Sequence, residues 1–98
     1  MTKQERMKIP RQEMPLQDTL IRRRNFEEVS LGLPEDVAIK EAERCLQCKK
    51  PKCVEGCPVG VLIPQFIKAL CEGNINEAVR VMKIKNNLPA VCGRVCPQ

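Results

Sequence analysis

The chain has 98 residues, a length at which a single domain is the natural expectation. Its net charge of +5 is mild, and Phe26 and Phe66 are its only aromatic residues, so it lacks the basic, aromatic-rich surface of a nucleic-acid-binding protein. The polar N-terminus leads into no apolar signal segment, and no stretch approaches the roughly 20 apolar residues that span a bilayer. We therefore expect a cytoplasmic protein that binds neither nucleic acid nor membranes.

The first third of the chain is predicted to be a docking segment, residues 1–33. Residues 1–15 are charged and interrupted by two prolines, so we expect them to be irregular and either mobile or laid on a partner. Residues 16–29 are predicted to form a first helix, because three apolar side chains share one helix face: Leu16, Leu20 and Ile21.

A second helix is predicted over residues 34–44, where it leads into a group of cysteines. Pro34 suits the first turn of a helix because its missing N–H costs nothing there. Glu35 and Asp36 then favour the positive end of the helix dipole. Ala38, Ala42 and Cys45 fall on one face, so this helix is expected to deliver Cys45 into the loop that follows.

The rest of the chain is predicted to be a helical hairpin between two cysteine loops. Residues 45–60 contain two prolines and two glycines and are expected to form the first loop. Apolar periodicity predicts helices over residues 63–72 and 75–86, and residues 90–98 are expected to form the second loop. The predicted fold is all-α, with about four helices, and residues 34–98 form its cysteine-bearing domain.

Six of the seven cysteines fall in these two loops with short, regular spacings. The first loop reads Cys45-x2-Cys48-x4-Cys53-x3-Cys57-Pro58, and the second reads Cys92-x3-Cys96-Pro97. A [4Fe–4S] cluster needs thiolates from several directions around one compact body, which a short irregular loop supplies. In ferredoxin-type runs the cysteine before proline ligates a different cluster. Cys45, Cys48 and Cys53 are therefore predicted to bind one cluster and Cys57 a second.

Other interpretations of these cysteines are open at this point. Zinc sites favour two Cys-x2-Cys pairs separated by a dozen or more residues, whereas Cys45 and Cys48 form the only such pair. Disulfides suit a secreted chain. Cys71 lies in a predicted helix and is interpreted as a small packed residue. The loop lysines (Lys49, Lys50 and Lys52) serve either solubility or the compensation of negative charge on a cluster.

These motifs resemble a known family. The matching stretches are Ala42–Cys48, Cys53, Gly56–Val59, Ile63-Pro64 and Cys92–Pro97, together with Lys8–Arg11 and Arg22–Phe26 in the predicted docking segment. They resemble the N-terminal iron–sulfur domain, of the alpha-helical ferredoxin type, of the glutamate synthase small subunit. Dihydropyrimidine dehydrogenase and the large subunit of the electron-bifurcating NADH-dependent ferredoxin–NADP oxidoreductase begin with the same type of domain.

The resemblance implies an all-helical domain with two [4Fe–4S] clusters inside a larger NAD(P)H-dependent oxidoreductase. A region that binds FAD and NAD(P)H would follow in the same parent chain. The clusters would relay electrons between that flavin and a second redox subunit or domain. By resemblance, Cys45, Cys48 and Cys53 match ligands of one cluster and Cys57 and Cys96 ligands of the other, whereas Cys92 matches a position that is usually not a ligand.

The family pattern continues past the second Cys-Pro with two more cysteines and a later Glu or Gln ligand, but the sequence stops at Gln98. We therefore expect a fragment cut at the C-terminal end of the motif, which leaves each cluster short of ligands. The chain carries no histidine and no dinucleotide-binding glycine motif, so no catalytic residue is assigned to it. The alternative function is a zinc-binding interaction module without a redox role.

Overall fold

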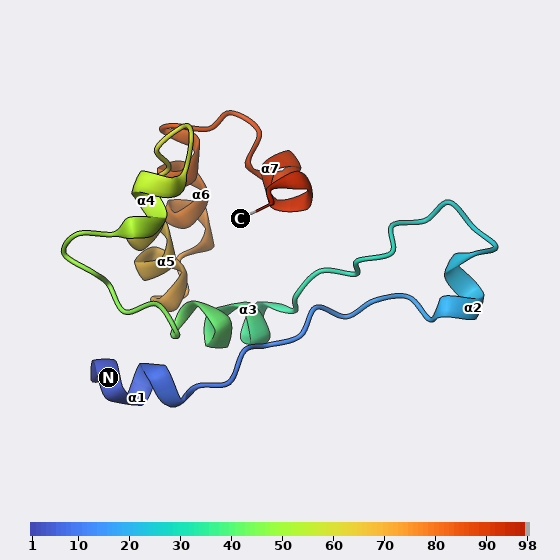
Figure 1. Ribbon diagram of the computed structural model, residues 1–98, viewed down its shortest axis with the longest axis horizontal. Helices are drawn as coiled ribbons and strands as arrows, with labels where there is room; N and C mark the ends of the chain where they lie inside the picture. The colour runs from blue at the N-terminus through green and yellow to red at the C-terminus, as the bar shows by residue number, and fades with distance from the viewer. Residues whose placement is uncertain (98) are drawn as a thin grey trace.

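The computed structural model describes residues 1–97, which form seven helices and one isolated β-bridge (Figure 1). Within these residues no helix is both long and apolar enough to cross a membrane. The helices are α1 (Lys3–Lys8), α2 (Thr19–Arg22), α3 (Glu35–Ala42), α4 (Lys52–Gly56), α5 (Ile63–Cys71), α6 (Ile75–Lys83) and α7 (Pro89–Val95).

The centre of the fold is the hairpin of α5 and α6, which the sequence predicts to within three residues at each end. Gly73 turns the chain between the two helices with a φ of +76°, which glycine adopts without a Cβ clash. Its N–H donates to the Leu70 carbonyl oxygen at 2.9 Å. The Asn74 side chain then accepts from the Glu77 N–H and caps α6.

The core of this hairpin is made of small side chains. Ala69 on α5 and Ala78 and Val81 on α6 are buried, and Ala42 adds one buried side chain from α3, which packs on α5. No large side chain is fully buried among the described residues. Because alanines occupy these positions, the helices approach closely, and precise packing rather than a large apolar area holds them together.

The prediction of a helix over residues 16–29 is wrong. Only Thr19–Arg22 is helical, and residues 15–31 instead form an extended hairpin, here called the arm, that projects away from α5 and α6 (Figure 1). Backbone pairing closes its base: Gln17 N–H donates to the Val29 carbonyl at 2.9 Å, and Leu31 N–H donates to the Pro15 carbonyl at 2.8 Å. The apolar side chains that suggested a helix have no surface to pack against and remain exposed.

Residues 1–15 are more ordered than the sequence suggests, because they begin with α1. Thr2 and Glu5 form a reciprocal capping box at its first turn. Arg6 anchors this helix to the body: its Nη1 donates to the backbone carbonyls of Glu43 (3.0 Å) and Cys45 (3.1 Å). The start of the chain is therefore tied directly to the first cysteine loop.

The two cysteine loops also contain helices that the sequence analysis missed. α4 forms within the first loop, and α7 occupies most of the second, which was expected to be irregular. Pro89 starts α7 at its first helical position, where proline is favoured. The helix predicted over residues 34–44 corresponds to α3. It begins at Glu35, one residue later than predicted, with Pro34 as its N-cap, and it ends at Ala42.

The molecule is open in shape. Its radius of gyration is 15.0 Å, whereas a compact domain of this length has about 12.6 Å. Its accessible surface of 7819 Å² exceeds by about 2,100 Å² the surface of a compact monomer of the same mass. The arm and the α7 segment account for much of this extension (Figure 1).

Candidate metal centre

The first pair of cysteines lies in a tight turn that follows α3. The Cys45 N–H donates to the Ala42 carbonyl at 3.0 Å, so the end of α3 carries Cys45 into the loop as predicted. Gln47 adopts a left-handed backbone with a φ of +52° and reverses the chain before Cys48. Cys45 is half-buried at the base of this turn, whereas Cys48 is exposed.

The two Cys-Pro sequences occupy equivalent positions, each at the end of a short helix. Cys57 ends α4 and Cys96 ends α7, both with extended backbone (φ −84°, ψ 117° and φ −64°, ψ 126°). Steric conflict with the following proline ring keeps the preceding residue out of the helical region, so each helix must stop at the cysteine. Cys53 and Cys92 lie four residues earlier, one turn back on the same helices.

The chain after Cys57 folds around its sulfur. The Val61 N–H donates to Cys57 Sγ at 3.5 Å, and the Gly60 N–H donates to the Cys57 carbonyl at 3.0 Å. Hydrogen bonds from the backbone N–H of Val61, and then of Val59, hold the pKa of the Cys57 thiol below its ordinary value, with a smaller contribution from Gly60. The turn of backbone amides around this sulfur, with the Val61 N–H bonded to it, favours its thiolate form, which is the form that binds metal.

Three adjacent hollows bring cysteines from both loops together. Cys57, Cys92 and Cys96 line an apolar hollow of about 480 Å³, walled by Phe66 of α5 and Met82 of α6. A neighbouring hollow of about 410 Å³ is lined by Cys53, Cys57 and Cys96. Cys45 and Cys53 line a third, of about 520 Å³, against α3 and α5. Cys57 and Cys96, which lie 39 positions apart in the sequence, therefore face a common space, and Cys45 and Cys53 face another.

The donors of the candidate site are cysteine sulfurs, which bind zinc as well as iron–sulfur groups. Among residues 1–97, no group of three or more cysteine or carboxylate side chains is arranged to hold one metal ion. A zinc ion needs four ligand atoms about 2–2.3 Å from one point. In this structure four cysteines line two neighbouring hollows of about 480 and 410 Å³: Cys53, Cys57, Cys92 and Cys96. Thiolate ligands around an apolar space with amides directed at sulfur are the features that iron–sulfur proteins use.

Cys71 differs from the other cysteines in its surroundings. It ends α5 outside both loops and is half-buried. Partial burial raises the pKa of its thiol, and the nearby Arg6 guanidinium opposes that effect. Its position agrees with the interpretation as a packed residue.

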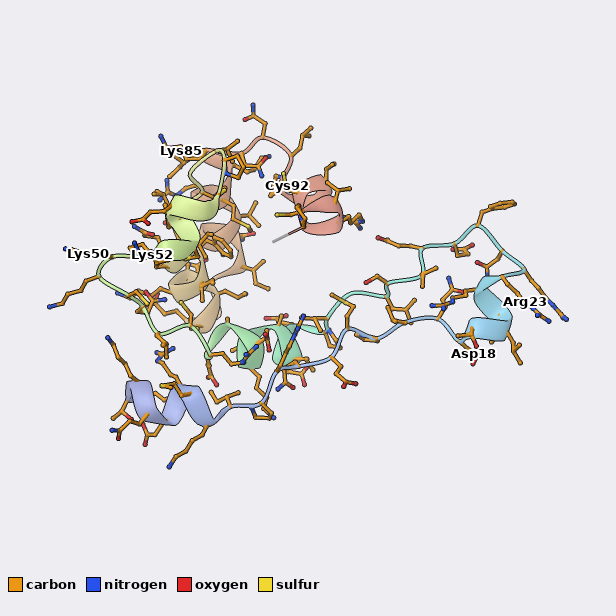
Figure 2. The ribbon with its side chains drawn as sticks, in the orientation of Figure 1. Asp18, Arg23, Lys50, Lys52, Lys85 and Cys92 are labelled. Carbon is orange, nitrogen blue, oxygen red and sulfur yellow. The ribbon has the colours of Figure 1, made fainter. Side chains whose placement is uncertain are left out.

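The loop lysines are exposed, but they differ in their distance from the cysteine hollows. Lys49, Lys50 and Lys52 are all exposed, and Lys50 extends away from the body on the far side from Cys92 (Figure 2). Lys52 pairs with Glu55 on its own helix at 3.1 Å. The positions of Lys49 and Lys50 agree with a role in loop solubility, whereas Lys52 also lines the hollow of Cys53, Cys57 and Cys96, so both interpretations stay open for it.

The sequence did not reveal the groups that surround the sulfurs. The amides after Cys57 are backbone groups, and their only sequence signal is the turn-forming pair Pro58 and Gly60. Arg6, which binds the carbonyl of Cys45, lies 39 residues away, and no local pattern marks it. Arg94 on α7 forms an ion pair with Glu28 of the arm, 66 residues away.

Comparison with known proteins agrees with this geometry. Residues 22–98 match the family model described as dihydropyrimidine dehydrogenase domain II, 4Fe-4S cluster. The glutamate synthase [NADPH] small chain of Azospirillum brasilense is 42% identical over 77 residues, which cover 79% of this chain and 16% of the relative. That of Escherichia coli (strain K12) is 41% identical over 90 residues, or 92% and 19%. That of Halomonas elongata is 49% identical over 65 residues, or 66% and 14%.

The chain thus spans less than a fifth of the length of these relatives. The matched residues contain all five predicted ligand cysteines, both Cys-Pro helix ends and the α5–α6 hairpin between them. The resemblance stated from the motifs is confirmed: the chain belongs to the family of 4Fe–4S domains represented by domain II of dihydropyrimidine dehydrogenase.

Proposed function

We propose that this chain is the electron-relay domain of an NAD(P)H-dependent oxidoreductase of the glutamate synthase small-chain type. Cys45, Cys48 and Cys53 serve one [4Fe–4S] cluster, and Cys57 and Cys96 serve a second. Bound clusters supply reversible one-electron chemistry, and this chain's residues position them and adjust their potentials. FAD and NAD(P)H bind elsewhere in the parent protein, and electrons pass between that flavin and a second redox subunit or domain.

One observation carries this proposal. Two Cys-Pro helix ends from opposite ends of the domain face a shared hollow, and the Cys57 sulfur accepts a hydrogen bond from the backbone N–H of Val61. The relatives add the class of enzyme, since their names specify glutamate synthase with NADPH. The domain itself contributes no histidine to acid–base catalysis. We also place the protein in the cytoplasm, a reducing compartment that keeps thiols available for iron.

The test uses the whole natural protein that carries this chain, purified without oxygen. We expect a brown protein with acid-labile sulfide and a broad absorbance that bleaches with dithionite. Cys57→Ser and Cys96→Ser should each lower the iron and sulfide content of the protein by the same amount, whereas Cys71→Ser should leave both contents unchanged. A colourless protein with stoichiometric zinc and no labile sulfide would refute the proposal.

We further propose that residues 1–33 dock the domain to other protein. The whole chain exposes about 2,100 Å² more surface than a compact monomer of its mass, whereas one partner contributes roughly 800 Å² to a standard interface. Apolar side chains near the tip of the arm are strongly exposed: Leu20 by 61%, Ile21 by 60% and Phe26 completely. Three consecutive arginines, residues 22–24, lie beside them, so the partner surface should be apolar with acidic groups at its edge.

Substitution of the tip tests docking without removing α1, whose Arg6 supports Cys45. In the whole protein we expect a variant with Leu20, Ile21 and Phe26 changed to serine to keep its iron and sulfide. It should lose its association with the second redox subunit, or lose protection of the arm from proteolysis if the partner is the rest of its own chain. A triple variant with unchanged association and unchanged protection would refute the docking role.

A further inference from the structure

Gln47 stands out among the described residues because it is the only non-glycine residue with a positive φ. Its φ of +52° belongs to the left-handed region, which costs an L-residue other than glycine, asparagine or aspartate about 1–2 kcal/mol. Such a conformation persists only where surrounding contacts hold it, and it is frequent at functional sites. Gln47 lies between Cys45 and Cys48, so this conformation sets the direction in which the chain presents both sulfurs.

The contacts that hold Gln47 come from its own side chain. Its Nε2 donates to the Pro64 carbonyl oxygen at 3.0 Å and to Cys45 Sγ at 3.5 Å. Pro64 is buried in the first turn of α5, so the first bond ties the cysteine turn to the central hairpin. The second places an amide N–H directly on the sulfur of a predicted cluster ligand. Both bonds are part-buried, which limits competition from water.

We infer that Gln47 is a positioning residue that fixes the Cys45–Cys48 turn and raises the reduction potential of the cluster these cysteines bind. An N–H that donates to a ligand sulfur stabilises negative charge on that sulfur. The reduced cluster carries one more negative charge than the oxidised cluster, so the hydrogen bond favours reduction. This inference rests on the proposed function, because it requires that Cys45 bind a cluster.

Two variants of the whole protein separate the conformational role from the electrostatic one. Gln47→Gly keeps the left-handed backbone without strain and removes both hydrogen bonds. Gln47→Glu keeps the shape of the side chain and replaces the donor by carboxylate oxygen. Gln65→Glu is the matched control, because it introduces the same charge at an exposed position in the first turn of α5.

The measurement is a redox titration of each cluster by electron paramagnetic resonance, together with iron and sulfide content. We expect Gln47→Gly to keep its iron. The equilibrium constant for reduction of one cluster should fall about tenfold, which makes its potential more negative by about 59 mV for one electron. Gln47→Glu should shift the same potential further, and Gln65→Glu should leave it unchanged.

Equal potentials in wild type and both Gln47 variants would overturn the inference and leave the proposed function intact. An equal shift in Gln65→Glu would also overturn it, because the effect would then be one of general charge. If Gln47→Gly loses its iron, the measurement on Gln47→Glu decides the question. A shifted reduction potential in Gln47→Glu supports the inference, and an unshifted potential or the absence of an iron-bound form refutes it. Absence of labile sulfide from the wild-type protein would instead refute the proposed function.

Discussion

Replacement of Ala78 by leucine tests whether close packing of α5 on α6 holds the domain together. Ala78 is only 2% exposed, the lowest value among the buried core residues, and lies where the two helices meet. Leucine adds three carbon atoms with no space to receive them. Overpacking of this kind costs about 1–3 kcal/mol. We expect the free energy of unfolding to fall by about 2 kcal/mol, a large share of the stability of a domain with so few buried residues.

Urea unfolding followed by circular dichroism measures this loss. With a denaturant slope of about 1.5 kcal/mol/M, the midpoint should fall by about 1.3 M while the slope stays the same. Ala90→Leu is the matched control, because it makes the same chemical change at an exposed position on α7 and should change stability by less than about 0.5 kcal/mol. Equal midpoints for Ala78→Leu and Ala90→Leu would refute the view that the α5–α6 contact is tightly packed.

Three further predictions concern the cysteines, the hairpin turn and the arm. The pKa of the Cys57 thiol is lowered and that of the Cys71 thiol is raised. Alkylation of the metal-free protein should therefore reach half its maximal rate at a lower pH for Cys57 than for Cys71. Mass spectrometry of the labelled peptides measures both rates, and the reverse order would contradict the prediction. Gly73→Ala should lower the free energy of unfolding by about 1 kcal/mol. Backbone strain is the whole cause, since an added Cβ meets no atom within 4 Å. Unchanged urea unfolding of the variant would disprove the strain. Arg94→Ala should speed hydrogen exchange of the α7 amides. Because the Arg94–Glu28 pair is exposed, about 1 M salt should have a similar effect on the wild type. Equal exchange rates in the variant and the wild type would show that the pair does not hold α7.

The central hairpin was predictable because its local and tertiary signals agree. Ile63, Phe66, Ile67 and Leu70 repeat at helical spacing, Gly73 ends the first helix and Asn74 starts the second. The structure places the apolar stripe of each helix against the other. Where a periodic stripe has a neighbour to pack on, sequence period predicts structure well.

The arm was mispredicted because its apolar period has no such neighbour. Leu16, Leu20 and Ile21 remain more than half exposed, and a helix through them would bury nothing. Asp18 caps a single turn, and the Asn25 side chain then bonds to Gln17 and to the Ile21 carbonyl to bend the chain back. Side-chain hydrogen bonds of this kind compete with helix and leave no periodic signal.

The sequence predicted that Cys57 and Cys96 belong to one site, but not the groups that surround them. Cysteine spacing and the following prolines predicted Cys57 and Cys96 as ligands of one cluster, and the structure places these two at one hollow. The α7 helix was missed even though Pro89 and Pro97 mark its start and stop. The left-handed conformation of Gln47 was also missed, because glutamine gives no sequence signal for it.

The paired base of the arm bears on the docking proposed for it. Two backbone hydrogen bonds and the Asn25 side chain hold the arm in one hairpin shape. A flexible peptide loses conformational entropy when it binds, whereas a loop shaped in advance avoids most of that loss. Substitutions at the base that touch no partner should therefore weaken association mainly through a faster dissociation rate.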